Sequence, residues 1–155
     1  MLQSKNRHLE QIGFLLGRAY YAYLGLLERE LRNFGLDGTC PPGIGSILFQ
    51  LYESDELAIG ELGQRLSLSK STMTGLIRKA KSHGLVTTAR DPNDGRATVV
   101  KLTKQAKAVE AKCNQLADRI ESLVAKNLTD RQRTSLKRSL SLVMQSISDA
   151  SEDSM

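Results

Sequence analysis

Apolar residues in the first part of the chain recur at steps of three and four positions. Between Asn6 and Phe34 this spacing predicts one long amphipathic helix, and Gly35 marks its end because glycine readily takes the left-handed backbone that follows a helix. A stripe of this length exceeds what a small domain can cover, so the rest of the chain or a second copy must bury it. Its members are Leu9, Ile12, Leu16, Ala19, Tyr20, Tyr23, Leu27, Leu31 and Phe34.

The middle of the chain predicts three shorter helices. Pro41 and Pro42 are expected to open the first, because proline is favoured at the first helical position. A second is expected over residues 60–66 and a third over 70–83, with Ser69 as the N-cap of the third. The buried face of the first helix is expected at Ile44, Ile47, Leu48 and Leu51, and the polar segment 53–56 is expected to form a loop.

The hydrophobic period then changes to that of strands. The β-prone runs 85–90 and 97–102 flank a cluster of Asp, Pro, Asn and Gly, which predicts a hairpin. Thr103 is expected to cap one long helix that reaches about residue 127, and Thr129 to open a last helix. The inward face of that last helix is expected at Leu136, Leu140, Val143 and Ile147. The fold class is thus mainly α, or α+β if the hairpin is counted.

The positive charge is concentrated in one segment. The whole chain has a net charge of +5, whereas residues 57–104 contain nine basic and three acidic side chains and carry +6. The remainder of the chain therefore sums to −1. A polyanion is the natural partner of such a field.

Two helices joined by a short turn and followed by a hairpin form a winged helix-turn-helix, whose second helix enters the major groove of DNA. A helical wheel of residues 69–83 places Met73, Leu76, Ile77 and Ala80 on one side, opposite Ser71, Gly75, Arg78 and Ser82, with Thr74 and Lys79 flanking. Small side chains let the helix approach the bases, and Arg78 can reach guanine acceptors. Ser69 and Lys70 lie at the helix N-terminus, where amide groups attract a phosphate. The alternative is an ordinary solvated face.

Arg96 follows the turn of the hairpin. An arginine on a projecting strand tip can enter a minor groove, where the potential is negative. Asp94, two residues earlier, is expected to hold the guanidinium in place. The alternative is a surface salt bridge that only stabilises the turn.

These segments resemble one known family. The run from Leu68 to Ile77, then Gly84-Leu85-Val86, the turn 91–96 and Leu102-Thr103 are similar to the MarR family of multiple-antibiotic-resistance-type regulators, and the likeness spans the whole chain. It implies a homodimer with interlocking helices at 1–40 and 103–155, and a DNA-binding lobe at 41–102. It also implies a pseudo-palindromic duplex operator. The groove-facing candidates it implies are Ser69, Ser71, Thr72, Thr74 and Arg78, with Arg96 on the wing.

Members of this family often bind small anionic aromatic effectors between the dimer helices and the lobe. By position, the candidate lining is Tyr20, Tyr23, Leu24, Ile47, Leu51 and Cys113. The alternative, which we favour for each residue, is plain core packing.

Other function classes have little support. The two cysteines, Cys40 and Cys113, are too far apart in sequence to suggest a disulfide framework, and we expect thiols, with Cys40 reactive if its loop is exposed. There is no nucleophile–base pair, phosphate loop or metal cluster, so we expect no enzyme, cofactor or metal. No apolar run approaches the roughly 20 residues of a membrane span and no leader is recognisable, which favours the cytoplasm. The competing function is a winged-helix module that binds another protein.

Overall fold

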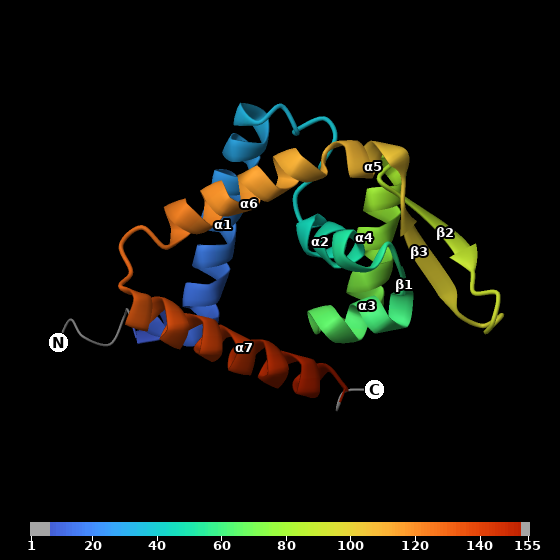
Figure 1. Cartoon of the computed structure of the whole chain (residues 1–155). Helices are drawn as coiled ribbons and strands as arrows, with labels where there is room; N and C mark the ends of the chain where they lie inside the picture. Colours follow the sequence, from blue (N-terminus) through green and yellow to red (C-terminus); the bar gives the residue numbers. More distant parts are fainter. Residues whose placement is uncertain (1–6, 153–155) are drawn as a thin grey trace.

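The computed structural model describes residues 7–152 and shows two groups of elements (Figure 1). A helical frame is formed by η1 (Arg7–Glu10), α1 (Ile12–Asn33), α6 (Glu110–Val124) and α7 (Asp130–Glu152). A lobe beside it contains α2 (Gly45–Ser54), β1 (Glu56–Ala58), α3 (Ile59–Leu66), α4 (Lys70–Ser82), β2 (Val86–Arg90), β3 (Thr98–Leu102) and α5 (Lys104–Ala108). The prediction of a mainly α fold with a winged helix-turn-helix is confirmed.

The core lies in the lobe. The largest side chains with less than 2% exposure all fall between residues 36 and 100, and they pack α2, α3 and α4 against the sheet. They are Leu36, Ile44, Ile47, Leu48, Leu51, Leu62, Met73, Leu85, Val86 and Val100. The lobe therefore holds its own helices in place, α4 included.

The sheet has three antiparallel strands in the order β1-β3-β2, one more than the predicted hairpin. Leu57 and Thr88 both pair with Val100 of the central strand. The prediction of a polar loop over 53–56 holds only at Asp55, because Glu53 and Ser54 end α2 and Glu56 begins β1. Glu56 forms an ion pair with Lys101 across the sheet. A three-residue strand is too short to show an alternating pattern, so it left no signal in the sequence.

The prolines do not open a helix. The first helix of the lobe begins at Gly45, after a turn in which Gly43 has φ of +95°. Proline followed by glycine with positive φ is the residue signature of a type II turn, and a proline disfavours helical backbone in the residue before it. Pro42-Gly43 thus forms a turn and delays the helix.

The predicted helix from 103 to 127 is broken in two at Val109, which has φ of −100° and ψ of 0°. The carbonyl of Ala106 accepts hydrogen bonds from the Val109 N–H at 3.3 Å and from the Tyr52 hydroxyl at 3.0 Å. Thr103 Oγ donates to the carbonyl of Gly84 at 2.6 Å. Residues 103–108 are therefore fastened to the lobe, and the frame resumes only after Val109.

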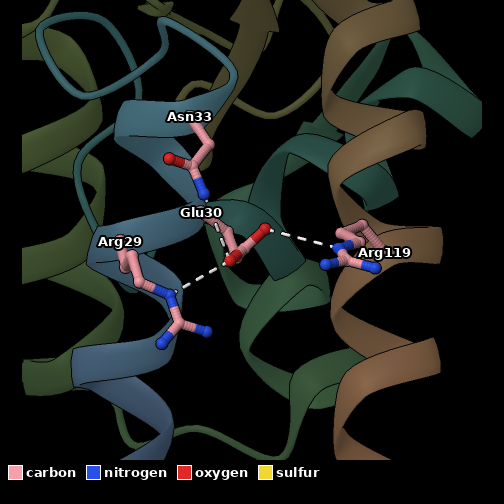
Figure 2. A network of polar contacts seen from close by, with 4 residues as sticks. All are labelled: Arg29, Glu30, Asn33 and Arg119. Carbon is pink, nitrogen blue, oxygen red and sulfur yellow. Dashed lines mark hydrogen bonds and ion pairs between the residues drawn. The ribbon is translucent and has the colours of Figure 1, made fainter.

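One buried carboxylate braces α1 against α6 (Figure 2). Glu30 is 4% exposed, and its carboxylate accepts hydrogen bonds from Arg29 Nε at 3.2 Å and Asn33 Nδ2 at 3.3 Å. Arg119 of α6 lies 3.5 Å from its second oxygen. Desolvation alone would raise the pKa of Glu30, but the two hydrogen bonds and the charges of Arg119 and Arg29 outweigh it and lower that pKa.

The outer helices leave much apolar surface uncovered. Ile12 and Tyr21 of α1 are 66% and 75% exposed. The inward face predicted for the last helix is not buried within the chain, since Leu136, Leu140 and Ile147 are all exposed. Among the described residues, no helix is both long and apolar enough to cross a bilayer.

Acid should weaken the brace at Glu30. Its pKa is lower in the folded state than the ordinary glutamate value of 4.5, so this stabilisation is fully present above that value and is lost as pH falls through the folded pKa. We expect Glu30→Gln to lower the unfolding midpoint at pH 7 and to flatten the loss of stability below pH 4.5. Urea unfolding across pH measures both. Glu28→Gln, exposed on the same helix, is the control, and equal curves for the two variants would contradict the brace.

Candidate nucleic-acid interface

Local capping and burial fix how α4 is set in the lobe. Ser67 takes the left-handed conformation with φ of 52° and ends α3. Ser69 then caps α4, because its hydroxyl oxygen accepts the N–H of Thr72 at 3.2 Å, as predicted. Met73 and Ala80 are 1% and 0% exposed and anchor the inner face. The opposite face of α4 must therefore point away from the core.

That outer face borders a hollow of about 1120 Å³. The predicted residues that the structure brings together along it are Ser69, Lys70, Ser71, Thr72, Thr74 and Arg78, with Gly75 between the last two. Ile147 and Ser148 of α7 form part of its boundary. Thr74 Oγ donates to the carbonyl of Lys70 at 2.8 Å, so this hydroxyl can still accept a hydrogen bond while its proton is engaged.

The wing is the hairpin formed by β2 and β3, and two carboxylates stiffen its turn. Asp91 Oδ1 accepts the N–H groups of Asn93 at 2.8 Å and Asp94 at 3.3 Å. Asp94 Oδ1 accepts the backbone N–H of Arg96 at 3.0 Å. The expectation that Asp94 holds the Arg96 guanidinium is wrong, since no ion pair joins these two described side chains. Asp94 instead shapes the backbone, which leaves the Arg96 side chain exposed.

Wing and α4 border a second, common hollow of about 850 Å³. Arg96 and Asp94 line it from the wing, and Lys70 and Thr74 line it from α4. Two cations from separate elements thus line one hollow, although they are 26 positions apart in the sequence.

Some basic side chains of the lobe are already engaged within the chain. Arg65 pairs with Glu61 at 2.6 Å, and Lys101 pairs with Glu56. Lys79 Nζ donates to the carbonyl of Pro42 at 2.7 Å, a contact between α4 and the segment before α2 that no sequence pattern predicts. Lys70, Arg78 and Arg96 are exposed, and within residues 7–152 none of them has an ion-pair partner.

A separate cavity of about 510 Å³ lies between α1, α6 and the segment 40–49. Of the candidate effector residues, Tyr20, Tyr23, Leu24 and Cys113 line it. Ile47 and Leu51 do not, because they are 0% exposed in the core of the lobe. A volume of this size is within the range of small-molecule sites. Burial raises the pKa of Tyr23, so its phenol is neutral near pH 7.

Two features of the cysteines were not expected from the sequence, the burial of Cys40 and the short distance between Cys40 and Cys113. Cys40 is buried, and its Sγ lies 3.9 Å from Sγ of Cys113 on the cavity wall. Sequence separation hid this proximity, because it arises where the segment after α1 turns, with the Leu36 carbonyl accepting the N–H of Cys40 at 2.7 Å, and leaves Cys40 beside α6. Across the described residues, no group of three or more His, Cys, Asp and Glu side chains is placed to hold a metal ion.

Known proteins are similar to this chain in sequence or in fold. The repressor IacR of Pseudomonas putida is 29% identical over 134 residues, which cover 86% of this chain and 78% of that protein. A mutant MarR of E. coli, solved in complex with operator DNA, superposes with a TM-score of 0.73 at 25% identity and covers 90% of this chain and 97% of that one. The fold also matches PcaV of Streptomyces coelicolor, solved with its natural ligand, with a TM-score of 0.75 at 20% identity, over 88% of this chain and 93% of that one.

The helix pair α3–α4, together with the β2–β3 wing of the three-stranded sheet, defines a winged helix-turn-helix protein. The family model described as "MarR family" matches residues 45–97, from the start of α2 to the wing turn. Over this segment the chain is similar to the MarR family, as the resemblance in its sequence implied.

Proposed function

We propose that this protein is a homodimeric, cytoplasmic transcription regulator that represses genes by binding a pseudo-palindromic DNA duplex. The observation that carries the proposal is the exposure of Lys70, Arg78 and Arg96 around two hollows that both border α4. Its relatives are named as transcription regulators, a class that acts by binding and not by catalysis.

The outer face of α4 fits the major groove. Gly75 adds no side chain beside Arg78, and a Cβ built at this glycine would meet nothing within 4 Å. The helix axis can therefore approach the base edges closely, and Arg78 can make the paired hydrogen bonds that identify guanine. Ser69 and Lys70 at the helix N-terminus, with Ser71, Thr72 and Thr74 along the first turns, bind phosphates or adjacent bases.

Arg96 makes the second contact, in the minor groove. Its turn is stiffened by the hydrogen bonds that Asp91 and Asp94 accept, so the arginine enters the groove from a largely ordered backbone. A narrow minor groove attracts a guanidinium through its negative potential. Asp94 is a positioning residue for this contact.

The homodimer follows from the uncovered apolar surface on the frame. Leu136, Leu140 and Met144 are exposed on neighbouring turns of α7, and Tyr21 and Phe14 are exposed on α1. A monomer would present this surface to water, at about 25 cal/mol for each Å². A second copy that packs on α1 and α7 removes the cost. Because Ile147 and Ser148 border the hollow in front of α4, the end of α7 must move away from α4 when a duplex binds.

The proposed boundary between the dimerisation and DNA-binding regions differs slightly from the one expected from the sequence. We assign residues 1–40 and the frame after Val109 to dimerisation, and 41–108 to DNA binding. The earlier boundary at residue 103 is moved because Thr103 and α5 are bonded to the lobe.

The 510 Å³ cavity is the site for a small aromatic effector. Leu24 and Leu116 provide apolar walls, and the neutral Tyr23 phenol is one polar group of the lining. No Lys, Arg or His lines the cavity among the described residues, whereas Glu121 does. An uncharged aromatic compound therefore suits this wall better than an anion.

A protein-binding module is the competing function. Interfaces between proteins are depleted in charge at their centre and enriched in aromatic residues. The outer face of α4 carries Arg78, hydroxyl side chains and a glycine, and has no large apolar residue exposed. The charge pattern favours DNA.

The direct test is selection of duplexes from a random-sequence library by the purified protein. We expect a twofold-symmetric consensus, and an affinity that falls steeply with salt, since each neutralised phosphate contributes a slope of about −0.9 on logarithmic axes. No enrichment over several rounds at low salt would overturn the proposal.

Arg78→Ala should lose base discrimination. At one symmetric position of the selected duplex we expect the preference to fall by about 1–3 kcal/mol, while thermal stability and dimerisation stay unchanged. Competition binding against single-base variants of the duplex measures this loss. Lys112→Ala removes one exposed charge from α6 and is the matched control, expected to keep the full preference. Equal profiles for both variants would refute the assigned role of Arg78.

Leu140→Asp should separate the dimer. A buried leucine contributes roughly 1.5–3 kcal/mol and a buried carboxylate costs more, so we expect dimer affinity to fall at least about 100-fold. Sedimentation velocity across protein concentrations measures the shift. Thr134→Asp introduces the same charge on the opposite face of α7 and should leave the dimer intact. A dimer that persists in Leu140→Asp would exclude this face from the interface.

A further inference from the structure

The two cysteines of the chain form an isolated thiol pair. Their Sγ atoms are 3.9 Å apart, and both line the 510 Å³ cavity, through which a small solute can reach them. A disulfide requires about 2.05 Å, so closure needs roughly 2 Å of relative movement. Cys40 lies in the segment between α1 and α2, while Cys113 lies in the first turns of α6. A loop can supply that movement more easily than a helix.

The surroundings distinguish the two sulfurs. The hydrogen bond between the thiols lowers the pKa of Cys113 to about 7 and outweighs burial, which would raise it. The same hydrogen bond, together with burial, raises the pKa of Cys40. Cys113 is therefore the nucleophile and Cys40 the thiol that donates to it.

We propose that Cys40 and Cys113 are a modification site for hydroperoxides, which oxidise the pair to an intramolecular disulfide that weakens DNA binding. The oxidation itself is independent of the proposed function, and the effect on DNA rests on it.

The chemistry proceeds in two balanced steps. The Cys113 thiolate attacks the terminal oxygen of the hydroperoxide, the O–O bond breaks, and the alcohol or water leaves after taking up a proton, so that Cys113 becomes a sulfenic acid. The Cys40 sulfur then attacks the Cys113 sulfur, the S–O bond breaks, and the hydroxyl departs as water with the Cys40 proton. The pair loses two electrons, and the peroxide gains them.

The segment that carries Cys40 also contacts α4, the helix proposed to enter the major groove. Pro42 lies two residues after Cys40, and its carbonyl accepts the hydrogen bond from Lys79 of α4 at 2.7 Å. Pulling Cys40 toward α6 therefore disturbs the hydrogen bond between Lys79 of α4 and Pro42. A dimer reads two half-sites at a fixed spacing, so a displaced lobe loses affinity.

Intact mass spectrometry tests the oxidation. The reduced full-length protein is treated with equimolar hydrogen peroxide and then with N-ethylmaleimide under denaturing conditions. We expect the loss of two hydrogen atoms and no maleimide adduct, with a monomer on a non-reducing gel. Two maleimide adducts, a sulfinic acid or a disulfide-linked dimer would each overturn the proposal.

Matched serine variants assign the roles. Cys40→Ser should stop at a sulfenic acid that dimedone traps at Cys113, and Cys113→Ser should keep one free thiol under the same treatment. Circular dichroism checks that both are folded, and the wild-type mass result stands without them. Trapping at Cys40 in place of Cys113 would reverse the assignment and contradict the mechanism.

The effect on DNA is measured by fluorescence anisotropy with a duplex selected by the reduced protein. We expect oxidation to weaken binding about tenfold, within the usual range of coupling between sites, and dithiothreitol to restore it. Cys113→Ser should bind equally with and without peroxide. Unchanged affinity after a confirmed disulfide would overturn the regulatory half of the proposal. Failure of the reduced protein to select any duplex would instead overturn the proposed function, while the mass result still decides the oxidation.

Discussion

Burial of one face of α4 in the lobe is the constraint on which the interface depends. Met73, Ile77 and Ala80 are packed against the core, and this packing fixes the rotation of the helix about its axis. A turn of the helix by one residue would move Arg78 about 100° around it. The Ser69 cap and the Gly84 turn fix its length, so the polar face has one orientation relative to the wing. The side chains of Arg96 and Lys70 border a common hollow because the buried apolar face of α4 holds the helix in this orientation.

The helical frame buries a smaller share of its apolar residues within the chain than the lobe does. The lobe buries its apolar residues within one chain, whereas many apolar residues of α1 and α7 are exposed, and specific side-chain contacts link α1 to α6. Glu30 and Arg119 form one such contact between α1 and α6. The segment after α1 carries Cys40 and Pro42, and it contacts both α6 and α4. This segment is where a change in the frame, by an effector or by oxidation, can reach the DNA-reading surface.

Much of this could be predicted from sequence, and the failures have physical reasons. Local signals worked where local interactions decide: Ser69 and Thr129 cap their helices, and the turn at Asp91 closes the wing. They failed where tertiary contacts decide. Tyr52 from another helix bonds to Ala106 where the predicted long helix breaks, and β1 exists only because β3 lies beside it. The polar face of α4 was predicted, but the closeness of Cys40 to Cys113 required the path of the chain in three dimensions.

The central claim is that two copies of one cationic surface bind a duplex together. Hydroxyl-radical footprinting of the wild-type protein on a selected duplex tests it most directly. The account predicts two protected regions related by twofold symmetry, with centres about one helical turn, roughly 10 base pairs, or a multiple of it apart. A single protected region, or protection without symmetry, would contradict the account.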